Sequence, residues 1–214
     1  MRHASLLVLA AACGGPATPS TSIPNPPPAS AAVPGLPPAY ARLFVAGEKS
    51  FAAEVVTSSF GDHGPETEKT PGKVTCTISK VTRVKDAHVA NLSCSGVEMI
   101  DGVSGTLVGT PTGLYRIDGT YDGRAPLSEK ELVLPAEPKA DRREWKDASG
   151  EEGFGHAVIV EPHAGGWCAM NVSWGGDEAG WQLCVRERDG LIGGHAFFAG
   201  GMTKDAFFGE VVRP

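Results

Sequence analysis

The chain has 214 residues, of which 28 are glycine and 17 proline, and its formal net charge is −6 at pH 7. This acidic balance excludes the basic footprint that nucleic-acid-binding proteins present, and it offers no surface for anionic lipid. The length is ample for a packed core without a metal or cofactor, so we expect none.

An export signal opens the chain. Arg2 precedes an apolar run from Leu6 to Ala12, and this run is too short to cross a bilayer as a helix. A basic start, an apolar middle and small residues at the end are typical of a signal peptide, here residues 1–12. Cys13 follows directly.

This stretch resembles the signal peptide of bacterial lipoproteins, in which a cysteine after small residues is diacylated on sulfur and becomes the first mature residue. Ala10 stands where that family usually carries Leu, Val or Ile. The resemblance implies a lipid anchor at Cys13 and a place in the cell envelope. In that family the residue after the cysteine influences sorting, and Gly14 rather than Asp at this position implies sorting to the outer membrane if the host has two membranes. Cleavage after Ala12 without lipidation is the alternative, and it would release a soluble protein.

Residues 13–38 form a proline-rich segment. Nine prolines, many Ser, Thr and Ala, and no charged residue lie between Gly14 and Pro38. Such a segment cannot bury enough apolar area to offset its ordering entropy. We therefore expect a disordered, partly extended linker between the lipidated Cys13 and the folded part.

Residues 39–214 show the periodicity of strands. Apolar residues alternate in Val74–Ile78, Ala90–Cys94 and Cys168–Trp174, and Gly, Pro, Asp and Asn separate the short runs. This pattern predicts an all-β domain, an antiparallel sandwich or barrel of about eight to ten short strands.

Two stretches favour a helix instead. They are Pro38–Ala46 and the charge-rich Pro138–Lys146, for which a solvated loop is the alternative.

Four cysteines remain once Cys13 is set aside. Each of two pairs is symmetric about a turn: Cys76 with Cys94 about Lys85–Asp86, and Cys168 with Cys184 about Gly176. Residues that face each other across a hairpin show this symmetry, so we predict the disulfides Cys76–Cys94 and Cys168–Cys184. A four-cysteine zinc site is the alternative, but C-x₂-C spacing is missing. The two cysteine hairpins also suggest two similar halves, 39–135 and 148–214.

A register about Gly176 makes both faces of the second hairpin apolar, which predicts either burial between two layers or one tryptophan face exposed as a binding platform. Near its tip, Trp174 with Asp177 and Glu178 forms a candidate binding patch. An aromatic ring beside carboxylates could stack on a sugar or hold a cation. Packing of Trp174 in the core is the alternative.

The sequence carries none of the common catalytic motifs. His156, His163 and His195 could together supply three nitrogens to zinc, although nothing in their spacing requires it. We therefore expect a non-enzymatic envelope protein whose β domain binds a protein, a glycan or a small neutral or cationic ligand, or has a structural role. The alternatives are an extracytoplasmic hydrolase of glycans or esters, and a zinc-binding protein.

Overall fold

The structure is a computed structural model that describes residues 33–61, 64–146 and 153–213. The predicted signal peptide, Cys13 and most of the proline-rich linker lie outside the described residues. The elements are α1 (Pro38–Ala41), η1 (Arg42–Phe44), β1 (Gly47–Gly61), β2 (Gly64–Val84), β3 (Ala87–Ser95), η2 (Ile100–Val103), β4 (Gly105–Gly109), β5 (Gly113–Ile117), β6 (Leu132–Pro135), β7 (Asp141–Lys146), β8 (Gly155–His163), β9 (Gly166–Gly175), β10 (Asp177–Arg186), β11 (Gly190–Ala199) and β12 (Thr203–Gly209).

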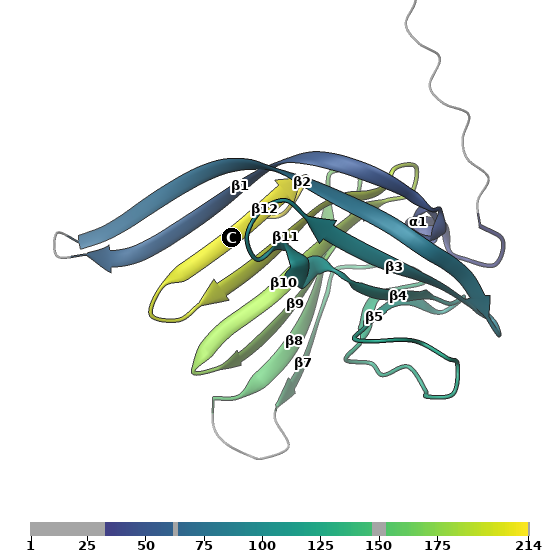
Figure 1. The fold of residues 1–214 in the computed structure, drawn as a ribbon. Coiled ribbons are helices and arrows are strands. Elements are labelled where there is room, and N and C mark those ends of the chain that lie inside the picture. The colour runs from purple at the N-terminus through teal and green to yellow at the C-terminus, as the bar shows by residue number, and fades with distance from the viewer. Residues whose placement is uncertain (1–32, 62–63, 147–152, 214) are drawn as a thin grey trace, which may run out of the picture. The chain divides into compact units, whose positions relative to one another are not determined.

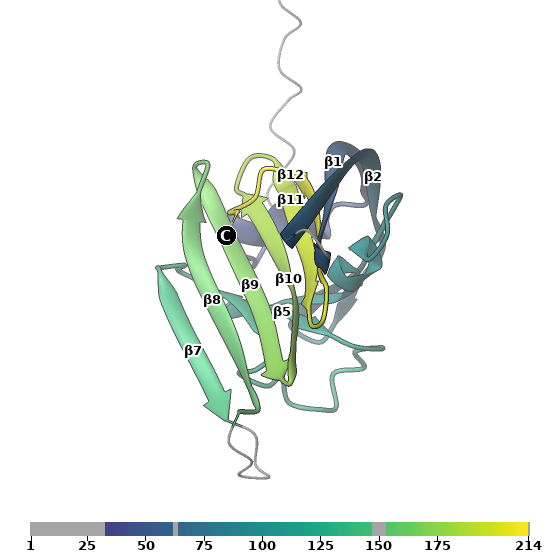
Figure 2. The same cartoon turned by 90° about the vertical axis from the view of Figure 1, so that its left-hand side faces the viewer.

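The described strands form one twelve-stranded antiparallel sheet in the order β6-β5-β4-β3-β2-β1-β12-β11-β10-β9-β8-β7. The sheet curls into an open half-barrel, as Figure 1 and Figure 2 show from two directions. The predicted all-β, antiparallel fold is confirmed. The segments suggested as two halves contribute to the same sheet, because β1 pairs with β12 from Ala53 opposite Phe208 to Ser58 opposite Thr203.

The inner face of the curled sheet carries the main core, because α1, η1 and η2 pack against it. Tyr40 and Leu43 belong to the same buried cluster as Leu107, Leu183 and Phe208 of the sheet. Complete burial of one such leucine side chain contributes roughly 1.5–3 kcal/mol. The segment of Pro38–Ala41 can start a helix because proline at the first position is already fixed near helical φ.

The curl brings strands from opposite ends of the sheet order across the interior from one another. The guanidinium of Arg116 on β5 lies 4.5 Å from the ring centroid of Trp181 on β10. A second, smaller apolar cluster lies on the outer face, and it contains Cys168, Cys184, Ile192, Phe207 and Val211. Within the described ranges, no helix has the length and apolar character needed to cross a membrane.

Both predicted disulfides are confirmed. Cys76 lies directly opposite Cys94, with 4.1 Å between their Cα atoms, and Cys168 lies directly opposite Cys184, at 4.0 Å. The first disulfide belongs to the inner core cluster and the second to the outer one. The register about Gly176 is also as predicted, and it places Ala169 and Leu183 inward.

One helix prediction is confirmed in part and the other is wrong. Pro38–Ala46 contains α1 and η1, which end at Phe44. Residues Asp141–Lys146, by contrast, form β7, where half-buried and exposed residues alternate with a period of two. The alternation of this strand was hard to recognise in the sequence, because Trp145 is its single large apolar residue that faces inward and its other residues are charged.

Candidate functional site

An open pocket lies at the corner of the sheet where β7 ends and β8 begins. It measures 320 Å³, and we call it the aromatic pocket. Its lining residues are Lys130, Trp145, Lys146, Phe154, Gly155, His156, Ser173 and Trp174. The inner face of β7–β9 forms one side, and the connection between β5 and β6 supplies Lys130 from the other.

Two glycines let aromatic rings lie directly on the backbone at this corner. A Cβ atom at Gly155 would lie 2.4 Å from Cζ2 of Trp174, which is opposite it in register. A Cβ atom at Gly175 would lie 2.2 Å from Cδ1 of Phe154. Any larger residue at either position would displace a ring, so the glycines fix the shape of the corner.

Trp145 and His156 form the inner wall. They are opposite each other in the β7–β8 register, and their ring centroids are 5.5 Å apart. His156 Nε2 is 3.4 Å from Asn171 Nδ2, and its Nδ1 is 3.3 Å from Ser173 Oγ. Burial lowers the pKa of His156, and a hydrogen bond to the backbone of Lys130 opposes this. His156 is therefore neutral at pH 7.

This wall has the atoms of a serine–histidine pair. In a catalytic triad, a carboxylate orients the histidine that serves as general base for the hydroxyl. The hydrogen-bond partners of the His156 ring among the described residues are Ser173, Asn171 and the backbone of Lys130, and none of them is a carboxylate. Both His156 and Ser173 present polar groups to the pocket.

The predicted patch is divided by the structure. Trp174 lines the aromatic pocket, with its ring over Gly155. Asp177 and Glu178 are exposed at the β9–β10 turn and do not line the pocket, although Glu178 is opposite Trp174 in register. Sequence reasoning missed Trp145 and Phe154. The alternation of β7, in which every second residue faces inward, was the signal that could have identified Trp145.

The three histidines considered for zinc lie apart. His156 lines the aromatic pocket, His163 is at the β8–β9 turn opposite Gly166, and His195 is on β11. Strands β9 and β10 separate β8 from β11. In the part of the chain that the structure describes, no three or more His, Cys, Asp or Glu side chains are grouped to hold a metal ion.

His195 is instead part of the outer-face packing. It is 2% exposed, and its ring stacks on Phe207 with centroids 4.1 Å apart. Its Nε2 donates to Asp205 Oδ1 at 2.9 Å, and its buried Nδ1 has no hydrogen-bond partner among the described residues. Burial lowers the pKa of His195, against the opposing effect of Asp205.

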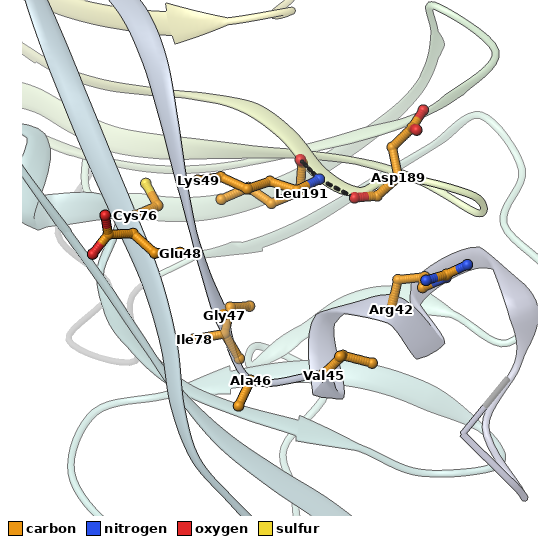
Figure 3. Close-up of a pocket in the computed structure, with 10 residues that line it drawn as sticks. All are labelled: Arg42, Val45, Ala46, Gly47, Glu48, Lys49, Cys76, Ile78, Asp189 and Leu191. Carbon is orange, nitrogen blue, oxygen red and sulfur yellow. Dashed lines mark hydrogen bonds between the residues drawn. The ribbon is translucent and has the colours of Figure 1, made fainter. Parts of the chain in front are cut away.

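A second pocket, of 180 Å³, lies between η1 and the start of β1 (Figure 3). Lys49 crosses it and donates from Nζ to the carbonyl oxygen of Asp189 and, at 3.2 Å, to that of Leu191. The pairing of β1 with β12 begins at Ala53, so β12 does not extend along the part of β1 that carries Lys49. There the side chain of Lys49 links β1 directly to β11. Burial lowers the pKa of Lys49, and the negative charge of Asp189 opposes this effect. We assign this cation a structural role, because two of its three N–H groups are used.

Comparison with protein-family models and with curated protein sequences found no match. Evidence about function therefore comes from the chemistry of the pockets themselves.

Proposed function

We propose that this protein is a non-enzymatic carbohydrate-binding protein, held to the cell envelope by lipid on Cys13 and by the linker of residues 13–38. The observation that carries the ligand class is the aromatic pocket, where Trp145 and Phe154 adjoin the polar groups of His156 and Ser173. The two disulfides are consistent with an extracytoplasmic location, since such bonds persist in oxidising compartments.

A sugar ring matches this combination of groups. Its C–H face packs on aromatic side chains, while its hydroxyls need donors and acceptors at the edge of the ring. Ser173 is exposed, and Phe154 is 40% exposed, so both are accessible to a ligand. The pocket volume is at the low end of small-molecule sites, about 300–1,000 Å³, which fits one sugar residue of a longer glycan.

The test is titration of the purified mature protein with oligosaccharides, followed by isothermal calorimetry and tryptophan fluorescence. We expect Trp145→Ala and Phe154→Ala to weaken binding at least ten-fold. Phe198→Ala is the matched control, because Phe198 is 39% exposed and does not line the pocket. Binding that survives Trp145→Ala and Phe154→Ala, or a complete absence of binding across neutral and acidic glycans, would reject the proposed site.

The anchor needs a separate test. Mass spectrometry of the mature protein is expected to find acyl chains on Cys13, and Cys13→Ser should move the protein from the membrane to the soluble fraction. An unmodified N-terminus at Cys13 or beyond would rule out the lipid anchor without bearing on the pocket.

Hydrolysis is the second candidate, because Ser173 Oγ lies 3.3 Å from His156 Nδ1. No carboxylate among the described residues bonds to the His156 ring, so we expect no ester hydrolysis that depends on Ser173. Turnover of p-nitrophenyl acetate or of a methyl-esterified glycan that disappears in Ser173→Ala would instead establish an enzyme.

A further inference from the structure

A small pocket on the outer face of the sheet contains two deeply buried polar side chains. It measures 170 Å³, and Glu161, Met170, Gln182 and His195 are among the residues that line it. Gln182 is 3% exposed and His195 is 2% exposed. Because buried polar groups need partners, this outer pocket is a candidate ligand site. Among the described residues it shares none with the lining of the aromatic pocket, so it is independent of the carbohydrate site.

His195 brings an unprotonated nitrogen to the outer pocket. Its Nε2 is 2.9 Å from Asp205 Oδ1, and an ionised carboxylate can only accept, so the proton of the neutral ring resides on Nε2. Nδ1 therefore carries a lone pair, and it is buried without a hydrogen-bond partner among the described residues. Histidines that bind a metal usually donate their other ring N–H to a carboxylate or carbonyl group, as His195 does here.

Met170 brings a thioether to the same pocket. It is directly opposite Gln182 in the β9–β10 register, and Gln182 is directly opposite His195 in the β10–β11 register. The three side chains therefore form one row on the outer face. The backbones of Met170 and His195 are two strand spacings apart, roughly 10 Å, so both side chains are long enough to meet at one ion above Gln182.

Two oxygen ligands are available beside this row. The sulfur of Cys184 lies 3.6 Å from Gln182 Oε1, but it belongs to a disulfide and has no proton to donate. The lone pairs of this amide oxygen are thus not used by that sulfur. Glu161, which is exposed and diagonal to Met170 across β8 and β9, adds a carboxylate at the rim. Sulfur, nitrogen and oxygen lone pairs gathered in one pocket suit a cation.

We propose that the outer pocket binds a soft metal cation, Cu(I), through Met170 Sδ and His195 Nδ1. Thioether ligands select Cu(I), and imidazole also binds copper, whereas Ca²⁺ and Mg²⁺ require sets of oxygen ligands. A structural zinc site needs four Cys, His or carboxylate ligands, and Glu161 and His195 alone do not supply them. The volume is below the about 300 Å³ at which small-molecule sites begin, which fits an ion.

The test is titration of the mature protein with Cu(I) in anaerobic buffer, against a chromophoric Cu(I) chelator. Cys13→Ser is included throughout, because it removes the one cysteine that neither disulfide contains. We expect Cu(I) to bind with a sulfur ligand detectable by X-ray absorption, and at least about ten-fold more tightly than Zn²⁺. Failure to bind Cu(I), or a bound Cu(I) without a sulfur ligand, would overturn the proposal.

Variants assign the ligands. Met170→Leu conserves the volume of the side chain, so it should keep the fold while it removes the sulfur signal and weakens Cu(I) binding about ten-fold or more. Met202→Leu is the matched control, because Met202 is 48% exposed and does not line the pocket. Asp205→Asn should weaken binding about 10–100-fold by releasing the orientation of His195. Equal affinities of Met170→Leu and Met202→Leu would overturn the proposed site and leave the carbohydrate function untouched.

Discussion

Arg143 of β7 donates from Nη2 to the carbonyl oxygen of Leu132 of β6 at 2.9 Å, and this contact joins the two edge strands of the sheet. No backbone ladder links β6 to β7 among the described strands, so a side chain provides the connection. The Nη1 group also approaches the carbonyl oxygen of Glu129 at 3.5 Å, just before the pocket residue Lys130.

Arg143→Met should therefore lower the free energy of unfolding by about 1.5–3 kcal/mol, because partly buried carbonyl oxygens lose a charged donor. Urea denaturation is the measurement. Arg142→Met is the matched control, since Arg142 is exposed and contacts Glu144, and it should change stability by less than about 0.5 kcal/mol. Equal effects of the two substitutions would show that the link between β6 and β7 contributes little.

Each disulfide should stabilise the domain by about 3 kcal/mol in the chain-entropy model, because the loops they close are short and alike. The sequence separations are 18 for Cys76–Cys94 and 16 for Cys168–Cys184. Paired substitution by alanine, one disulfide at a time, should lower the midpoint of urea unfolding by similar amounts. Titration of the native protein with a thiol reagent should detect none of these four sulfurs, and four reactive thiols would refute the pairing.

Stability should fall on acidification through the buried His195. Its pKa is lowered in the folded state by burial, so the unfolded chain binds more protons as the pH drops. The stabilisation is fully present above the unfolded pKa, about 6.5, and declines as the pH falls below it. Urea midpoints between pH 7.5 and 5 should decrease, and His195→Gln should flatten this dependence. An equally steep dependence in His195→Gln would contradict the assignment to His195.

Gly155→Ala should disturb the aromatic pocket without touching a polar group. The added Cβ would overlap the ring of Trp174, and such overpacking typically costs about 1–3 kcal/mol. We expect altered tryptophan fluorescence and weaker glycan binding. Gly201→Ala is the control, because a Cβ atom there would meet nothing within 4 Å. An unchanged fluorescence spectrum in Gly155→Ala would show that the ring has room to move.

The local features of this fold were accessible from the sequence, and the long-range ones were not. Cysteines placed symmetrically about Gly176 and Lys85–Asp86 were sufficient to predict two hairpin registers, because opposed positions in a hairpin depend only on the turn. Nothing local indicated that Arg143 would meet Leu132, since that contact depends on the curl of the whole sheet. The pocket was only partly predictable for the same reason: Trp174 stood out beside a turn, whereas Lys130 reaches the pocket from another part of the chain.

The first and last of the described strands, β1 and β12, are neighbours at the middle of the sheet (Figure 1). Their pairing joins Glu54 to Phe207, so it forms only when nearly all of the folded part is available. Contacts between such distant positions form slowly, because loop closure costs entropy before any pairing offsets it. A chain that is synthesised from its N-terminus must therefore leave one side of β1 unpaired until β12 is available. Completion of the sheet in this way depends on the last strand to be made.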